Sequence, residues 1–459
     1  MSFNKNPLVT VYITNYNYGR YIEQSIKSVL NQTFKDYELL IIDDGSDDES
    51  KSIIEGYTKK KNIFSIYQLN KGLNASNNVA MKMARGKYIM RLDADDFLAP
   101  QAVEIMIAEL ERNSECALVF PDYYFVDEEG EVIQQVRRYE FENDVTLLDQ
   151  PAHGACTMIR TELLKAVGGY DSDLNRQDGY DLWLNITAQY SVKNVNLPLF
   201  YYRQHSNNLT KDESSLLKAR SEIKAKHVKK RGIKPLSVLA IIPTRGEKLD
   251  PRSTPLRKLG DKYLIDWTIE TTLASELVTD IIVTTPDQTV IDHVGKKYGT
   301  NIIVHLRKAE LAKVNTKIEA TVNEVKKIYE VNHPKTDAFF MLYLEYPFRS
   351  TMYIDKAINT MLLYDVDMVD AVRPDDDMFY FHTGHGLEPW YKNKKLRLER
   401  EDLYRRVGGM QLVKKDFLIQ KKDMFTGKVG HIIVDEKASF LLRSELHWGL
   451  ARELARQEK

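Results

Sequence analysis

The stretch from Tyr88 to Asp96 reads YIMRLDADD and decides the fold. Its apolar start is typical of a buried strand, and that strand ends in acidic residues. Consecutive side chains of a strand point to opposite faces, so Asp93 and Asp95 would share one side. Oxygen ligands favour magnesium or manganese, and two carboxylates leave coordination positions open for water and phosphates. The stretch therefore predicts a strand that presents Asp93 and Asp95 to one hard cation, with a nucleotide diphosphate as its partner.

Other short apolar runs surround this stretch and alternate with helical patterns. We expect strands over Leu8–Ile13 and Tyr37–Ile42, with a helix over Tyr21–Asn31 between them. Alternating strands and helices predict an α/β sheet with right-handed crossovers. A similar alternation begins after residue 236, with the strand Ser237–Ile242, the helix Leu264–Ser275 and the strand Asp280–Thr285. The fold class is therefore expected to be α/β, with two tandem nucleotide-binding domains.

Composition sets limits on the class of protein. The 459 residues carry a formal net charge of −1, with 43% hydrophobic and 29% charged residues. At about 150 residues per domain, this length suits two or three globular domains and excludes a disordered chain. Two cysteines exclude a disulfide framework, and the balanced charge argues against a nucleic-acid partner. No apolar run reaches the ~20 residues of a membrane span and no secretory signal is recognisable, so we expect a cytoplasmic protein.

The boundary between the domains is predicted from a basic stretch, Lys218–Gly232, which reads KARSEIKAKHVKKRG. We expect a helix that runs into a linker, because Gly232 and Pro235 follow it. The predicted organisation is a first domain over residues 1–217, a basic helix and linker over 218–234, and a second domain over 235–459. Two interpretations of the basic run stay open: a solvated helix face, or contact with an anionic membrane surface or a phosphorylated acceptor.

Polar loops follow the first two strands. The first strand runs into Thr14, Asn15 and Tyr16, and the next one ends in Asp43 and Asp44. In open α/β sheets, ligands bind outside the carboxyl ends of the strands, so both loops would fall at one rim. Carboxylates at this rim can accept hydrogen bonds from a base or from ribose hydroxyls. The structural alternative for the two aspartates is a turn followed by a helix N-cap.

These motifs together resemble the family 2 glycosyltransferases, which have the GT-A fold. The resemblance spans residues 7–210, and its motifs are Thr14-Asn-Tyr-Asn, Ile-Asp43-Asp44-Gly-Ser, Asn70-X-Gly72 with Asn77, and Leu-Asp93-Ala-Asp95-Asp96. It implies a nucleotide-diphosphate sugar donor, inversion at the anomeric carbon, and Mg²⁺ or Mn²⁺ held by Asp93 and Asp95. The implied donor-binding residues are Thr14, Asn15, Tyr16, Asp43, Asp44, Asn70, Gly72, Asn77, Asp93, Ala94 and Asp95.

Two later segments extend the resemblance. Gly168-Gly169-Tyr170-Asp171 and Gln177-Asp178-Gly179-Tyr180-Asp181-Leu182-Trp183 resemble the family's glycine pair and acidic segment. An acceptor alcohol is a poor nucleophile, so the chemistry needs a carboxylate that removes its proton. The resemblance assigns this base to Asp178, with Asp181 as the fallback and an N-cap as the structural alternative for Asp178. The closing Tyr-Arg-X-His segment implies that Arg203 and His205 stabilise the leaving diphosphate.

The second domain opens with a strand and the loop Pro243-Thr-Arg245-Gly246, which makes Arg245 a candidate ligand of nucleotide phosphates. With Pro255-Leu-Arg257, Leu306-Arg307 and Gly408-Gly409, it resembles the cytidylyltransferases that activate sialic acid as a CMP derivative, over residues 236–445. The family's lysine–asparagine pair is absent here, and its late pair of metal carboxylates is reduced to Asp435. Because nucleotidyl transfer relies on cations, we expect an impaired site unless Lys248, Arg252 or Lys262 substitutes.

The sequence thus predicts a metal-dependent inverting glycosyltransferase that moves a sugar to a hydroxyl of a glycan, a lipid-linked glycan or a protein. Bacterial surface-polysaccharide or glycoprotein biosynthesis is the process that this pairing of domains suggests by family analogy. One alternative is a bifunctional glycosyltransferase and CMP-sugar synthetase. The other is a non-catalytic scaffold that binds nucleotide sugars. A lipid-linked acceptor would add peripheral contact with the inner face of the membrane.

Overall fold

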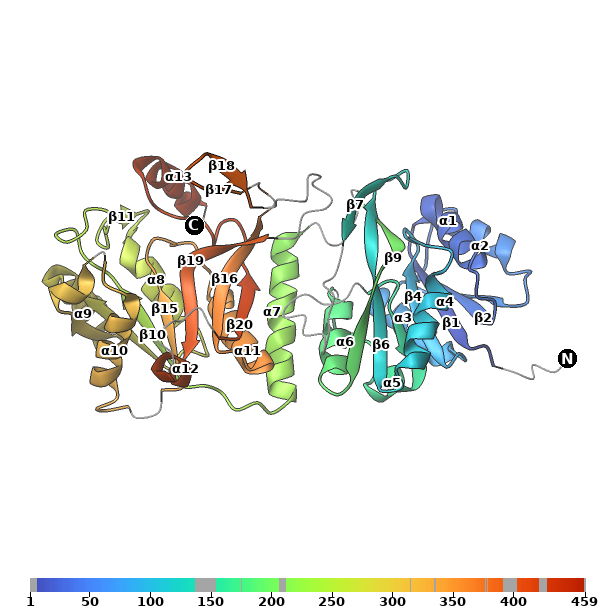
Figure 1. The fold of residues 1–459 in the computed structure, drawn as a ribbon, viewed down its shortest axis with the longest axis horizontal. Helices are drawn as coiled ribbons and strands as arrows, with labels where there is room; N and C mark the ends of the chain where they lie inside the picture. Colours follow the sequence, from blue (N-terminus) through green and yellow to red (C-terminus); the bar gives the residue numbers. More distant parts are fainter. Residues whose placement is uncertain are drawn as a thin grey trace. The chain divides into compact units, whose positions relative to one another are not determined.

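The structure is a computed structural model, and its ribbon is shown in Figure 1. It divides into two compact units, Met1–Asp212 with Phe379–Arg400, and Glu213–Met378 with Glu401–Lys459. The two units are treated separately below. The residues that the structure describes are 6–136, 154–174, 176–205, 212–313, 315–333, 336–375, 377, 379–390, 403–420 and 427–457.

The first unit is built on a mixed sheet with the strand order β3-β2-β1-β4-β8-β6-β9-β5, in which β7 pairs with β6. The run β3-β2-β1-β4 is parallel, and β8 pairs antiparallel with both β4 and β6. The strands are β1 Val9–Asn15, β2 Tyr37–Asp43, β3 Ile63–Tyr67, β4 Tyr88–Asp93, β5 Phe97–Leu98, β6 Cys116–Val126, β7 Val132–Val136, β8 Met158–Arg160 and β9 Ser191–Arg203.

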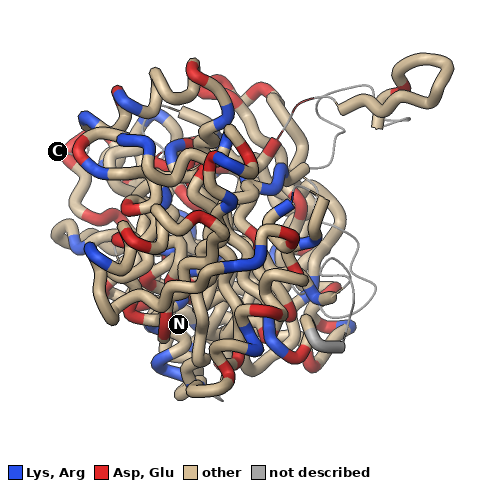
Figure 2. Tube along the Cα trace, turned by 90° about the vertical axis from the view of Figure 1, so that its left-hand side faces the viewer, with Lys and Arg blue, Asp and Glu red and all other residues tan. Residues whose placement is uncertain are grey.

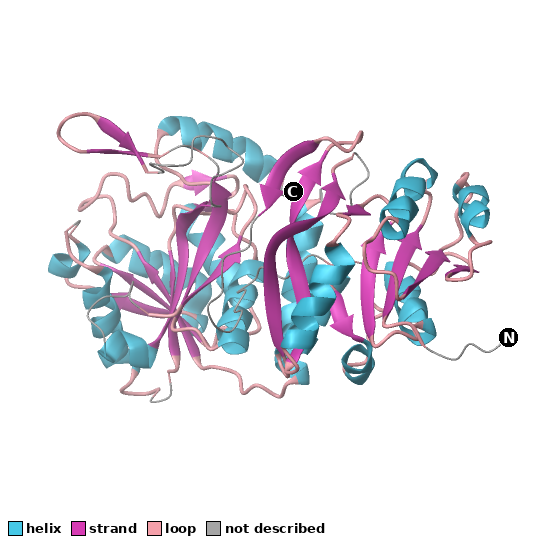
Figure 3. Cartoon of the chain, turned by 45° about the vertical axis from the view of Figure 1, so that its right-hand side comes forward, coloured by secondary structure: helices cyan, strands magenta, loops and turns pink. Residues whose placement is uncertain are grey.

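Helices cover this sheet, as the cartoon in Figure 3 shows. β1 and β2 are buried along their whole length, as expected for central strands with helices on both faces. The expected strands and the first helix are confirmed within one or two residues at most ends. The helices are α1 Gly19–Leu30, α2 Ser50–Tyr57, α3 Leu73–Met83, α4 Ala102–Arg112, α5 Thr161–Ala166 and α6 Asp178–Thr187.

Strand register brings the polar loops of the first unit to one edge. Thr14 lies opposite Asp93, and Asn15 lies opposite Asp43, because β1 is paired in parallel with both β2 and β4. The carboxyl ends of these parallel strands therefore form a single rim. This pairing confirms the prediction that the acidic ends of these strands lie at one edge of the sheet.

The second unit has its own sheet, in the order β14-β13-β10-β15-β19-β16-β20. Its first four strands are parallel, and β19 is antiparallel to both of its neighbours. The strands are β10 Val238–Pro243, β13 Asp280–Thr285, β14 Ile303–Leu306, β15 Ala338–Leu342, β16 Met368–Asp375, β19 Leu403–Lys414 and β20 Val429–Ile433. A smaller pair in this unit is β11 Lys258–Leu259 with β12 Lys262–Tyr263. The pair of β17 Tyr380–His382 with β18 Leu387–Pro389 lies in the segment that belongs to the first unit.

The helices of the second unit pack around this sheet. They are α7 Glu213–Lys230, α8 Leu264–Leu273, α9 Gln288–Tyr298, α10 Ile318–Tyr329, α11 Thr351–Tyr364, α12 Lys415–Gln420 and α13 Glu445–Arg456. In the part of the chain that the structure describes, no helix is both long and apolar enough to cross a membrane. Figure 2 shows acidic and basic residues interspersed along the trace, in keeping with the balanced charge.

Helix α7 contains the basic stretch that was expected to lead into a linker. One side of the helix packs on α11, where Leu217 and Ile223 are buried and the Lys224 Nζ donates to Thr360 Oγ1 at 2.8 Å. The compact units meet between residues 212 and 213, so α7 belongs to the second unit. The side of the basic stretch that faces α11 is thus a packing surface.

A glycine in the first unit gives a test of how tightly this sheet is packed. A Cβ on Gly86 would lie 2.4 Å from the Thr10 backbone nitrogen, whereas a Cβ on Gly56, inside α2, would meet nothing within 4 Å. We expect Gly86→Ala to lower the free energy of unfolding by about 1–3 kcal/mol through overpacking. Gly56→Ala, the matched control, should raise it by about 0.5–1 kcal/mol.

Urea denaturation of both variants, followed by circular dichroism, measures this difference. Equal midpoints for Gly86→Ala and the wild type would contradict the close approach of Gly86 to β1.

Candidate functional site

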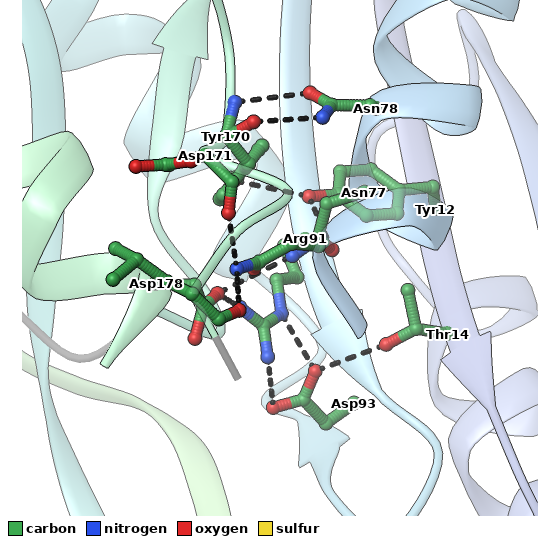
Figure 4. A network of polar contacts seen from close by, with 11 residues as sticks. Tyr12, Thr14, Asn77, Asn78, Arg91, Asp93, Tyr170, Asp171 and Asp178 are labelled. Atoms are coloured by element: carbon green, nitrogen blue, oxygen red, sulfur yellow. Dashed lines mark hydrogen bonds and ion pairs between the residues drawn. The ribbon is translucent and has the colours of Figure 1, made fainter. Parts of the chain in front are cut away.

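A buried arginine joins the carboxylates at the rim of the first unit (Figure 4). Arg91 comes from β4, and its side chain is 6% exposed. It donates to both oxygens of Asp93, from Nε at 2.7 Å and from Nη2 at 3.0 Å, and from Nη1 to Asp178 Oδ2 at 2.5 Å. Burial alone would lower the pKa of Arg91, but the ion pairs with Asp93 and Asp178 outweigh it and hold that pKa well above its ordinary value.

The backbone around Asp178 brings its carboxylate to Arg91. Asp178 is the first residue of α6, and Gln177 before it adopts a left-handed conformation with φ of 60°. A Cβ on Gly179 would lie 3.4 Å from the Gly154 Cα, so two backbone segments approach each other closely here. Such a strained turn is common at functional sites.

The two oxygens of Asp178 have different surroundings. Oδ2 accepts from Arg91 and, at 3.3 Å, from Asn77 Nδ2. Among the residues that the structure describes, no hydrogen bond reaches Oδ1. The carboxylate is therefore held by one oxygen, and the other oxygen is available to a ligand.

A second layer of polar side chains fixes this arrangement. The Tyr12 hydroxyl donates to Asn77 Oδ1 at 3.2 Å and lies 3.1 Å from the Tyr170 hydroxyl. Asn78 bonds the backbone of Tyr170 in both directions. Burial raises the pKa of Tyr170 to about 12, which keeps this phenol a neutral hydrogen-bonding group at physiological pH.

The next acidic residues along the chain face a histidine. Asp95 Oδ2 lies 2.9 Å from His205 Nε2, and both side chains are buried. The His205 ring stacks on Tyr21 at 5.5 Å and meets the edge of Tyr18 at the same distance. Burial, together with the nearby carboxylates of Asp95 and Asp93, holds the pKa of Asp96 well above its ordinary value. The side chains of Asp93, Asp95 and Asp96 therefore lie close enough to influence one another, and the raised pKa favours the neutral form of Asp96.

Arg203 lies under this cluster and supports it. Its side chain donates to the backbone oxygens of Asp95, Asp127 and Glu128 and to Gln24 Oε1. Its backbone nitrogen donates to Asp96 Oδ1. A guanidinium bound in this way would have to break these contacts before it could hold a diphosphate, which the sequence expectation did not foresee.

The acidic pair at the end of β2 is bound by its own loops. Asp43 accepts from Asn15 Nδ2 at 2.7 Å and from the Ser46 hydroxyl at 2.6 Å. Asp44 accepts from the backbone nitrogens of Lys71 and Gly72, at 2.9 and 2.8 Å. These contacts match the turn alternative, and they also shape the loop that carries Gly72. Tyr16, 48% exposed, and the exposed Asn70 remain accessible at this rim.

The second unit brings two arginines together beside β10. Arg307 is 5% exposed and donates to the Thr244 backbone oxygen at 2.8 Å and to Thr321 Oγ1 at 3.0 Å. Its Nε has no hydrogen-bond partner among the described residues. Burial and the neighbouring Arg245 lower the pKa of Arg307 to about 10. Two like charges thus meet here, with Asp250 bonded to Arg245 at 3.1 Å and the Glu324 carboxylate partly offsetting the lowered pKa of Arg307.

The remaining carboxylate of the expected metal pair in this unit has structural partners. Asp435 Oδ2 accepts from the Tyr353 hydroxyl at 2.7 Å, and Oδ1 accepts from the Ala438 nitrogen at the same distance. Lys262 bonds Glu270 at 2.7 Å, and Arg252 bonds Asp250 at 3.2 Å. Within the described ranges, no three His, Cys, Asp or Glu side chains gather as a metal site.

Comparison with known proteins identifies both halves of the chain. Residues 10–168 match the family model described as glycosyl transferase family 2, and residues 239–404 match the one described as cytidylyltransferase. The chain carries a family 2 glycosyltransferase domain followed by a cytidylyltransferase domain.

Curated relatives match the glycosyltransferase domain. A chondroitin synthase from Escherichia coli is 31% identical over 44% of this chain and 30% of its own length. An uncharacterized glycosyltransferase from Methanocaldococcus jannaschii is 34% identical over 40% of the chain and 65% of its own length. A hyaluronan synthase from Pasteurella multocida is 29% identical over 45% of the chain and 21% of its own length. The chain thus spans less than two thirds of these relatives.

Solved structures resemble about half of the chain. S. aureus TarS 1-349 has 20% identity and a TM-score of 0.41, over 48% of this chain and 65% of that chain. A mannosyltransferase from Pyrobaculum calidifontis, solved with GDP-Man and Mn²⁺, has 15% identity and a TM-score of 0.40, over 49% of this chain and 65% of that chain.

The glycosyltransferase domain gathers most of the residues that its sequence motifs single out. Thr14 bonds Asp93 at 3.3 Å, the Ala94 nitrogen bonds the Thr14 oxygen, and Asn77 reaches Asp178. The fallback base Asp181 is buried in the first turn of α6 and accepts from Asn185 at 3.0 Å. Sequence reasoning missed Arg91, although a lone charge inside an apolar strand is a usable signal.

Arg91 gives a sharp test of this site. Replacing it by methionine would leave the partly buried carboxylates of Asp93 and Asp178 unpaired. The cost should approach about 3–5 kcal/mol, the cost of breaking a buried ion pair. The control Lys87→Met removes an exposed pair with Glu111, formed at 2.8 Å, and should cost less than about 1 kcal/mol.

Urea denaturation of the full chain measures both losses. An Arg91→Met variant that is as stable as Lys87→Met would show that the ion pairs of Arg91 do not hold the site together.

Proposed function

We propose that the glycosyltransferase domain transfers a sugar from a nucleoside-diphosphate donor to an acceptor hydroxyl, with inversion. The observation that carries the proposal is the pairing of Asp178 and Asp93 through Arg91. Asp178, held by Oδ2, presents Oδ1 to an acceptor hydroxyl as a general base. As the acceptor oxygen bonds the anomeric carbon, its proton passes to Asp178 and the bond to the diphosphate breaks.

Arg91 suits this role because it orients the base without covering it. When one oxygen of a carboxylate is fixed, the direction of the second oxygen is defined as well. This lowers the entropy cost of reaching a reactive geometry. Asp93, bound by the same guanidinium, is aligned in the same step. We therefore assign to Asp93 a contact with the donor and to Asp178 a contact with the acceptor.

A divalent cation fits beside Asp95. The Asp95 oxygen and the His205 nitrogen converge, and Asp96 retains a buried oxygen with no hydrogen bond from any described residue. Mg²⁺ or Mn²⁺ bound there by Asp95 and His205 would supply positive charge for the departing diphosphate. Both oxygens of Asp93 already bond Arg91, so we propose His205 rather than Asp93 as the second metal ligand. His205 would then bind the cation, instead of acting on the diphosphate as the sequence predicted.

The acceptor class follows from the relatives. The curated chondroitin and hyaluronan synthases are named for glycan products, and we propose a glycan hydroxyl as the acceptor here. Surface-glycan assembly at the inner face of a membrane is the setting we propose, with the exposed part of α7 as the contact.

Substitution of the base tests the reaction. Asp178→Asn should lower turnover by about 10²–10⁴-fold, because the amide cannot accept the proton. Asp181→Asn, the variant of the fallback base, should retain far more activity. Transfer is measured with a panel of UDP- and GDP-sugars and Mn²⁺ on glycan acceptors.

Thermal shifts with UDP and GDP show whether each variant still folds and binds. A larger loss in Asp181→Asn than in Asp178→Asn would move the base to Asp181. A wild type that binds a diphosphate without turnover on any acceptor would favour the scaffold alternative.

A second function is favoured by Arg307. We propose that the cytidylyltransferase domain binds nucleotide phosphates between Arg245 and Arg307, with little nucleotidyl transfer. The buried Arg307 keeps an Nε with no hydrogen-bond partner among the described residues, so an anion there would gain a charge-assisted hydrogen bond. Asp435 is bound by Tyr353 rather than presented to a metal.

Titration of CTP or pyrophosphate tests this pair. At a hundred times the dissociation constant, a ligand should stabilise the wild type by about 2.7 kcal/mol. Arg307→Met should abolish this gain, while Lys308→Met, at an exposed neighbour, should keep it. Release of pyrophosphate from CTP at enzymatic rates would instead support the bifunctional alternative.

A further inference from the structure

A row of side chains crosses the glycosyltransferase domain next to its acidic cluster. Register places Gln135 of β7 opposite Tyr124 of β6, Tyr124 opposite Tyr201 of β9, and Tyr201 opposite Phe97 of β5. We refer to these four residues as the aromatic row. The Phe97 and Tyr201 rings stack with centroids 4.5 Å apart, and the Tyr124 and Tyr201 rings stack at 5.3 Å. All four side chains are only partly buried.

The row lies on the face of the sheet that α6 covers. Val119 and Tyr123 of β6 both belong to the hydrophobic core, and Phe120 and Tyr124 directly follow them, so both point to the other face. Trp183 of α6 meets the Phe120 ring edge-on at 5.4 Å. Tyr123, on the opposite face, belongs to the hydrophobic core. The aromatic row is thus not part of that core, and it shares its face with the helix that begins at Asp178.

The row also ends at the edge of the reaction site. β4 and β6 both run antiparallel to β8, so their carboxyl ends point to the same edge of the sheet. Phe97 directly follows Asp96, and Tyr201 lies four residues before His205. The Arg203 guanidinium, which holds the Asp95 backbone oxygen, lies 5.5 Å from the Phe97 ring centre.

Sheet order separates this row from the candidate donor loops. The loops after β1 and β2 lie on one side of β4, whereas β6, β9 and β5 lie on the other. Inversion requires the acceptor to approach the anomeric carbon from the side opposite the diphosphate. The strands that carry the row are therefore on the acceptor side of Asp93.

The chemistry of the row suits a sugar ring. It combines three aromatic rings, two phenol hydroxyls and one amide, and it carries no charge. Aromatic carbon packs on the C–H face of a pyranose, while hydroxyl and amide groups bond its hydroxyls. Nucleotide phosphates would need positive charge, which the four residues do not provide.

We propose that the aromatic row Phe97, Tyr201, Tyr124 and Gln135 binds a pyranose ring of the acceptor glycan. The proposal rests on the proposed glycosyl transfer for its direction, because it places the acceptor beside Asp178. It names a subsite formed by strands β5, β9, β6 and β7, none of which supplies a candidate acid or base.

Binding of methyl β-glycosides to the full chain tests the row. The probes are the methyl β-glycosides of glucose, N-acetylglucosamine and glucuronic acid, followed by saturation-transfer NMR. At least one should bind the wild type, and Tyr124→Ala and Tyr201→Ala should each weaken it by about tenfold or more. Leu197→Ala, at a 48% exposed position of β9 outside the row, is the matched control and should bind as the wild type does.

Nucleotide-induced thermal shifts separate the outcomes. These nucleotide shifts should be unchanged in the row variants. If an alanine variant does not fold, Tyr124→Phe or Tyr201→Phe, which keeps the ring, takes its place. Each phenylalanine variant should weaken glycoside binding by about threefold. Wild-type protein that binds none of the glycosides, or row variants with unchanged glycoside affinity, would overturn the proposal. So would row variants that lose nucleotide binding instead.

The proposed transfer can fail independently of the row. If Asp178→Asn keeps full turnover while the row variants lose glycoside binding, the assignment of the base is wrong and the row stands. If the wild type binds glycosides but no nucleotide, the row belongs to a carbohydrate-binding domain without transfer.

Discussion

One buried guanidinium determines how the glycosyltransferase domain is organised around its site. Arg91 connects a strand end, Asp93, with the start of α6, Asp178, and these aspartates are far apart in sequence. Each carboxylate would be costly to bury alone, and the arginine would be costly to bury without them. The second layer of Tyr12, Asn77 and Tyr170 connects to this ion pair through Asn77, which also donates to Asp178 Oδ2. The same ion pairs thus hold β4 and α6 together and orient the side chains proposed for the reaction.

The sequence predicted the scaffold better than the connections within it. Alternating strands such as Leu8–Ile13 are local patterns, and the structure forms them where expected. The rim could also be predicted, because the ends of parallel strands meet by geometry. The partners of Arg91, by contrast, depend on a left-handed turn at Gln177 and on contact between Gly154 and Gly179, which no local pattern encodes. For the same reason, spacing could not show that Asp435 bonds Tyr353.

The two halves of the chain treat buried charge in opposite ways. In the glycosyltransferase domain, Arg91 is matched by two carboxylates, and further carboxyl groups gather around Asp95 and Asp96. In the cytidylyltransferase domain, Arg307 and Arg245 leave an excess of positive charge. A negative cluster attracts a cation, and a positive cluster attracts phosphate directly. The two sites therefore differ in what they need from solution, even though both lie at the ends of parallel strands.

The packing of α7 has a practical consequence for dividing the chain. A recombinant second half that starts at residue 235 would lack α7, exposing the surface of α11 that Leu217 and Ile223 cover. Exposed apolar helix faces promote aggregation, so such a fragment is a poor choice for expression. A fragment that starts at residue 213 retains the helix and its Lys224–Thr360 bond. The point at which to divide the two domains is therefore set by a helix that the sequence predicted only as the start of a linker.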